Sequence, residues 1–194
     1  MSYASSDSGE PRRTYLLIDG ENIDATLGMS VLGARPNPEQ RPRWDRITEF
    51  AERTWDQPVT ALFFLNATHG QLPMPFIQAL LAMGYQPIPL SGSGETGEEV
   101  VDIGIQRTLK ALVSRPGDVM LGSHDGDYVP QVERLATDGR RLAVLGFREF
   151  ISAKLTEIDG VRAYDLEDHI GAFTAPLPRV RVIPLAAFDP TRYL

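Results

Sequence analysis

The chain of 194 residues contains no cysteine, which excludes disulfide frameworks, thiolate zinc sites and cysteine nucleophiles. It has no uninterrupted apolar run near the ~20 residues that a membrane-spanning helix requires. Residues 1–13 are small and polar and lack the apolar segment of a secretory signal, so we expect them to form a flexible leader. These absences predict a cytoplasmic protein that does not bind a membrane.

Positive charge is outnumbered, because 19 lysine and arginine residues stand against 26 acidic residues and give a net charge of −7. Only two of the nineteen cationic residues are lysine. Domains that bind nucleic acid through their whole surface are normally basic, so this balance argues against such a domain. A local basic surface is still compatible with it, and arginine suits bidentate contacts with phosphate. Any binding of nucleic acid therefore has to occur at a limited site.

Strand and helix patterns alternate along most of the chain. Apolar runs predict strands at 14–19, 59–65, 85–90, 118–123, 141–146 and 161–164, with 85–90 at a sheet edge because it contains two prolines. Helical spacing predicts helices at 44–54, 75–83, 98–114, 128–138 and 149–156, with a loop over 30–43. This order predicts one Rossmann-like α/β/α domain over 14–170, with a mainly parallel sheet of about five strands. Residues 171–194 form a Pro-rich tail that we expect to wrap the body or a partner.

Two acidic clusters follow predicted strands. Asp19 ends the first strand, and Asp125 and Asp127 come directly after the fourth. Asp102 stands in the first turns of the helix predicted at 98–114. The carboxyl ends of neighbouring parallel strands meet at one crevice, so these four carboxylates are expected to lie near one another. Crowded like charges are costly, and a divalent cation offsets that cost.

The donor set at these positions consists of carboxylate oxygens, without thiolates. Hard oxygen ligands select Mg²⁺ or Mn²⁺, and a pair of such ions can activate water for phosphodiester cleavage. The alternative is purely structural, because Asp-Gly is a common turn after a strand and Asp is a common N-cap. The metal-site interpretation assigns ligand and catalytic roles to Asp19, Asp102, Asp125 and Asp127.

Three motifs resemble those of the NYN domain, in the LabA-like branch of the PIN-like nucleases: Leu17-Ile18-Asp19-Gly20-Glu21-Asn22, Val101-Asp102, and Ser123-x-Asp125-x-Asp127-Tyr128. The resemblance covers residues 14–168 and implies a PIN-like fold. It implies a Mg²⁺- or Mn²⁺-dependent ribonuclease that cleaves RNA, most readily single-stranded, with the four aspartates as metal ligands. It also implies that Asn22 and Ser123 bind or position the substrate.

Two positions depart from the family pattern. Glu99 stands where many LabA-like members have a lysine, and Thr108 stands where they often have an acidic residue. The sequence therefore leaves two functions open: a metal-dependent endoribonuclease, or a catalytically weak or inactive NYN module that binds RNA or a regulatory protein partner. The edge strand near Tyr85 and the C-terminal tail are both candidates for forming a homo-oligomer, and the tail is a candidate for binding a protein partner.

Further candidate RNA contacts lie in the Arg-rich stretch around Trp44, since guanidinium groups with an aromatic ring suit single-stranded RNA. The arginines are Arg35, Arg41, Arg43 and Arg46. The alternative is a solvated loop with Trp44 in the core. His124, between candidate ligands, either donates to a phosphate or faces solvent.

Overall fold

The computed structural model describes residues 12–68, 70, 72–93, 99–179, 183, 185–192 and 194. Its centre is a six-stranded, wholly parallel sheet in the order β3-β2-β1-β4-β5-β6. The strands are β1 (Thr14–Asp19), β2 (Val59–Asn66), β3 (Tyr85–Leu90), β4 (Asp118–Gly122), β5 (Leu142–Gly146) and β6 (Val161–Asp165). The predicted α/β class is confirmed, and the expectation of about five strands is corrected to six. The predicted leader lies almost wholly outside the described residues.

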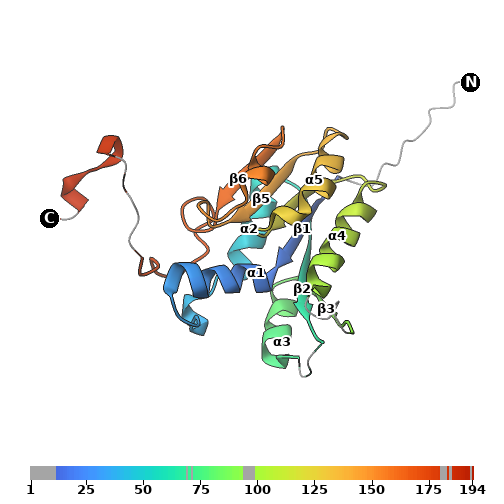
Figure 1. Cartoon of the computed structure of the whole chain (residues 1–194), viewed down its shortest axis with the longest axis horizontal. Helices are drawn as coiled ribbons and strands as arrows, with labels where there is room; N and C mark the ends of the chain where they lie inside the picture. The colour runs from blue at the N-terminus through green and yellow to red at the C-terminus, as the bar shows by residue number, and fades with distance from the viewer. Residues whose placement is uncertain are drawn as a thin grey trace, which may run out of the picture.

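Helices cover both faces of the sheet, as Figure 1 shows. They are α1 (Gly20–Ala25), α2 (Trp44–Trp55), α3 (Met74–Ala82), α4 (Val100–Leu112), α5 (Val129–Ala136) and α6 (Ala153–Thr156). Buried residues of α1, α2 and α3 pack into one apolar cluster with Leu16 and Ile18 of β1. Buried residues of α4, α5 and α6 pack into a second cluster with Leu17. Side chains alternate across a strand, so these two clusters occupy opposite faces of the sheet and define three layers.

The order in which strands are added to the sheet reverses between β1 and β4. From β1 the chain builds outward through β2 to β3, and it then returns to place β4 on the other side of β1. Ile18 pairs with Gly122, so the carboxyl ends of β1 and β4 are level and the next residues are Asp19 and Ser123. A reversal of this kind is where open α/β sheets bind ligands. It places two of the three predicted motifs side by side.

The segment after α1 differs from the sequence prediction. A π-helix continues from Thr26 to Leu32, where a loop was expected from residue 30. Leu27 and Val31 are buried one turn apart, which explains why this segment stays helical against the core. The turn ends at Gly33, whose φ of 66° is a left-handed conformation suited to glycine.

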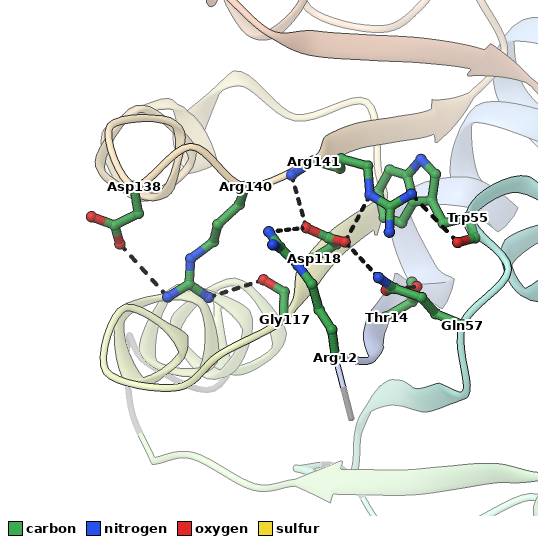
Figure 2. Close-up of polar contacts among 9 residues, drawn as sticks. All are labelled: Arg12, Thr14, Trp55, Gln57, Gly117, Asp118, Asp138, Arg140 and Arg141. Atoms are coloured by element: carbon green, nitrogen blue, oxygen red, sulfur yellow. Dashed lines mark hydrogen bonds and ion pairs between the residues drawn. The ribbon is translucent and has the colours of Figure 1, made fainter. Parts of the chain in front are cut away.

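A buried carboxylate joins the strands at the opposite, amino end of the sheet. Asp118 begins β4 with no exposed surface, and its oxygens accept hydrogen bonds from Arg12 (2.9 Å), Gln57 (3.0 Å) and the Nε of Arg141 (2.8 Å) (Figure 2). Burial raises its pKa, but these donors outweigh burial and hold the pKa below its usual value. Asp118 is thus a paired structural carboxylate. No helix of the described residues has the length and apolarity to cross a membrane.

Candidate metal centre at the end of the first strand

Asp19 is buried at the point where β1 ends and α1 begins. Its side chain is 2% exposed, and its Oδ1 accepts the N–H of Asn22 at 3.1 Å, which caps the helix. Its Oδ2 accepts two hydroxyl groups, Ser123 Oγ at 3.1 Å and Tyr128 OH at 3.0 Å. The aspartate is therefore held by groups from both β1 and the segment that follows β4.

The hydroxyl of Tyr128 joins Asp19 to Asp102. Tyr128 is fully buried, and its OH lies 3.0 Å from Asp102 Oδ1 as well as 3.0 Å from Asp19 Oδ2. A phenol carries a single proton, so it cannot donate to both carboxylates at once. When it donates to one of them, the other can complete its contact only by carrying a proton of its own. The first and second motifs thus meet at one atom of the third.

Burial makes this pair of carboxylates resist ionisation. Burial raises the pKa of Asp19 to about 6, and the nearby charge of Asp102 adds to the effect. Burial also raises the pKa of Asp102, with further contributions from the charges of Asp125, Asp127 and Glu99. The pKa of Tyr128 is raised by burial and by both neighbouring carboxylates, so its hydroxyl keeps its proton. Among the described residues, no cationic side chain pairs with Asp19 or Asp102.

Asp125 and Asp127 lie at a more exposed position. Asp125 caps a short 3-10 helix (Gly126–Tyr128), and its Oδ1 accepts the N–H of Asp127 at 2.9 Å. Both carboxylates are near enough to raise the pKa of Asp102. Over the described ranges, however, no group of three or more acidic or histidine side chains gathers closely enough to hold a metal ion. The structure joins Asp19 and Asp102 through the Tyr128 hydroxyl and places Asp125 and Asp127 farther out.

The two predicted substrate-binding residues both contact other residues of the site. Ser123 is fully buried; its Oγ donates to Asp19 and accepts the N–H of Asp125 at 3.3 Å. Asn22 Oδ1 accepts the backbone N–H of His124 at 2.9 Å and lies 2.8 Å from the ring Nδ1. These contacts orient the aspartates and the loop after β4.

His124 is a buried structural residue, and neither alternative from the sequence is correct for it. It is 6% exposed, and its Nε2 accepts the N–H of Phe147 at 2.9 Å. This contact assigns the ring proton to Nδ1, which donates to Asn22. Burial lowers the pKa of His124 to about 4, which keeps the ring neutral. The ring stacks on Phe147 with centroids 5.7 Å apart, so His124 joins the loop after β4 to the end of β5.

Tyr128 is a site residue that was not predicted from the sequence, although its identity carried a signal. A buried tyrosine hydroxyl usually finds a hydrogen-bond partner, and Tyr128 directly follows a pair of candidate ligands. Thr108, one of the two departures, donates its hydroxyl to Gly104 O at 2.8 Å within α4. It therefore acts as an ordinary helix residue.

The Arg-rich stretch is largely engaged within the chain. Trp44 is 6% exposed and packs edge-on against Phe63, so the core alternative is correct for it. Arg41 pairs with Asp24, Arg43 with Asp45, and Arg46 donates to the carbonyls of Gly171 and Phe173; these contacts account for three of the four arginines.

Comparisons with known proteins agree with this fold and these motifs. The NYN domain family matches residues 13–165, a range that contains all three motifs. Among solved structures, a protein of unknown function from Vibrio parahaemolyticus is similar, with a TM-score of 0.66 and 18% identity over 84% of this chain and 98% of that chain. At that identity the likeness concerns the fold alone. No curated protein matches the chain.

Fold and family together define the class as an α/β domain of the nuclease-like type. The chain belongs to the NYN domain family, which confirms the resemblance found in the sequence.

Replacing the buried carboxylate tests its charge. Because the pKa of Asp19 is raised from 3.8 to about 6, the folded state binds more protons than the unfolded state between these pH values, and stability falls as pH rises through them. Asparagine does not ionise, so the Asp19→Asn variant should not lose this stability. The difference in free energy of unfolding between the variant and the unchanged chain should therefore shift by about 3 kcal/mol in favour of the variant from pH 3 to pH 7. Urea unfolding at both pH values measures this, with exposed Asp159→Asn as control. A difference that stays constant with pH would show that Asp19 ionises normally.

Removing the bridging hydroxyl tests its contact with the carboxylates. We expect Tyr128→Phe to lower the free energy of unfolding at pH 7 by about 2 kcal/mol, because hydrogen bonds to charged groups are the stronger ones. The matched control is Tyr85→Phe, since Tyr85 is equally buried and donates to the neutral carbonyl of Trp44 at 3.0 Å. Equal losses in the two variants would contradict a special role for the Tyr128 hydroxyl.

Proposed function

We propose that this protein is a metal-dependent ribonuclease that cleaves RNA phosphodiesters at the carboxyl ends of β1 and β4. The observation that carries the proposal is the meeting of Asp19 and Asp102 at the hydroxyl of Tyr128. Two acidic residues from distant motifs share one donor at the sheet reversal, in a domain whose family is nuclease-like. A fold that merely needed a helix cap at Asp19 would not need a second carboxylate there.

The chemistry of the donors fits Mg²⁺ or Mn²⁺. The residues that would hold the ion are Asp19, Asp102, Asp125 and Asp127, which offer hard oxygens and no sulfur. The raised pKa of Asp19 supports the assignment, because it marks a buried carboxylate that has no cationic partner among the described residues. When bound, such an ion supplies a water of lowered pKa and neutralises charge on the scissile phosphate.

The residues of the chain would divide the remaining work. Ser123 and Tyr128 orient the Asp19 carboxylate through its Oδ2, which restricts the direction in which it can accept a ligand. His124, a neutral donor, holds the amide of Asn22 beside the end of β1. We therefore assign Asn22 and Ser123 primarily to positioning. The substrate that we propose is single-stranded RNA.

A second candidate function is a module that binds RNA or a protein without turnover. The observation in its favour is Glu99, whose charge adds to those around Asp102 where a lysine would have neutralised a phosphate. A binding module needs the fold and the surface but not a functioning centre.

Cleavage of single-stranded RNA in the presence of Mn²⁺ tests the proposal. We expect cleavage products with 5′-phosphate ends, and a loss of at least about a hundredfold in rate for Asp19→Asn and Asp125→Asn, because an interaction made in the transition state is removed. The matched control is Asp159→Asn, which changes an exposed aspartate just before β6, at the opposite end of the sheet. Activity that survives both site substitutions would refute the assignment. RNA binding without cleavage would favour the second candidate.

A further inference from the structure

A large apolar groove lies beside the candidate metal centre. Its volume is about 1300 Å³, and it runs from α1 and the π-helix on one side to α3 on the other. Trp44, Phe63 and Phe76 contribute aromatic rings to its lining, and Phe63 packs edge-on against both of the others. Other residues of the lining are Pro36, Pro38, Pro42, Pro73 and Pro75, together with Met29 and Met83. A concavity of this size and composition suits an apolar ligand.

The charged groups of the groove are mostly neutralised within the chain. Arg41 makes two contacts with Asp24, at 2.8 Å and 3.2 Å. Arg43 makes two contacts with Asp45, at 3.2 Å and 2.9 Å. Two of the three arginines that line the groove are thus already paired, and Arg35 alone among them has no acidic partner within the described residues. One unpaired guanidinium offers little to a phosphodiester chain. An apolar polypeptide segment fits it better than RNA does.

Exposed apolar side chains concentrate on a second surface, the distal segment, which we define as the described residues 183, 185–192 and 194. Over the described part of the chain, four of the eight large apolar side chains that remain exposed belong to it: Ile183 (40%), Leu185 (88%), Phe188 (48%) and Leu194 (105%). Met29, on the wall of the groove, is another at 77%. Concentrations of exposed apolar surface mark interaction sites. The distal segment and the groove are therefore chemically complementary.

The chain is attached to the body near the groove before the distal segment begins. The N–H of Arg43, which lines the groove, donates to Ala172 O at 2.6 Å. Farther on, Leu177 is buried and Arg179 pairs with Glu149 and Glu167. Beyond these contacts, residues 185–192 (red in Figure 1) lie away from the body. Residues 185–192 thus do not cover the groove of their own chain.

The edge of the sheet at β3 is a poor alternative for self-association. β3 is one of the two edge strands, and it carries Pro87 and Pro89 at alternate positions. Proline has no N–H, and in paired strands it is found with this side facing away from the sheet. The free edge of β3 therefore lacks donors at both positions, which opposes the addition of another strand. Of the two candidate surfaces that the sequence indicated, only the C-terminal tail remains.

We propose that the groove binds the distal segment of a second copy of this chain. Each copy offers one groove and one segment, so a reciprocal exchange makes two identical contacts and closes as a two-fold symmetric dimer. Leu185 and Phe188 enter the groove beside Met29, and the exposed apolar side chains of both surfaces are covered together. The exchange places each copy's segment next to the partner's candidate metal centre, since Gly20 and Glu21 also line the groove.

Sedimentation equilibrium of the full chain tests the dimer. We expect the double variant Leu185→Asp/Phe188→Asp and the single variant Met29→Asp each to raise the dissociation constant at least about tenfold, because each removes apolar area from the contact. These side chains are exposed, so the fold should tolerate the changes. The control is Leu81→Asp, on α3 with 58% exposure but outside the groove, which should dimerise normally. A chain that stays monomeric at every concentration would overturn the proposal.

The absence of cysteine allows a second test that identifies the contact. Oxidation of a mixture of the single variants Met29→Cys and Leu185→Cys should give a mixed disulfide between copies in excess of either self-linked product. The pair Leu81→Cys and Leu185→Cys should not. If a chain carrying both Met29→Cys and Leu185→Cys closes an internal disulfide instead, the segment covers its own groove and the exchange is refuted. If Met29→Asp weakens RNA binding without changing association, the groove is an RNA surface and the proposal also fails.

Discussion

The reversal of strand order between β1 and β4 is the constraint on which the rest of the molecule depends. It makes neighbours of Asp19 and Ser123, which are separated by about a hundred residues of chain. It also leaves two sets of helices to cover the two faces of the sheet, each with its own apolar cluster. All neighbouring strands are parallel, so each connection between them crosses one face of the sheet or the other.

Polar groups are buried at both ends of the sheet, but in opposite electrostatic states. At the amino end, Asp118 has arginine partners and a lowered pKa, so its charge is stabilised as it stands. At the carboxyl end, Asp19 shares its hydroxyl donor with Asp102 and has a raised pKa. Burial of a carboxylate therefore does not by itself indicate function in this protein. In the part of the chain that the structure describes, Asp19 has no cationic partner, and this distinguishes the candidate site from the structural cluster around Asp118.

Much of the fold could be predicted from the sequence, because periodicity is local. Val101, Ile105 and Leu109 recur at helical spacing and are buried in α4, within the helix predicted at 98–114. The prolines of β3 correctly indicated an edge strand. The π-helix after α1 was missed because its packing against the core decides its conformation. The contacts of Tyr128 and His124 were missed for a related reason: they join residues about a hundred positions apart, which no local pattern encodes. The meeting of strand ends predicted that the four aspartates lie near one another, and Asp19 and Asp102 do meet at Tyr128. The outward position of Asp125 and Asp127 depends on the turn that Asp125 caps.

The proposed function requires that the carboxylates at the reversal of strand order form a cation site. A crystal structure of the full chain soaked in Mn²⁺, with anomalous data that locate the metal, tests it most directly. We expect one or two manganese peaks bound by Asp19 and Asp102, with Asp125 or Asp127 completing the ligands. Manganese bound only elsewhere, or Asp19 and Asp102 still joined through Tyr128 at saturating Mn²⁺ with no peak between them, would contradict it.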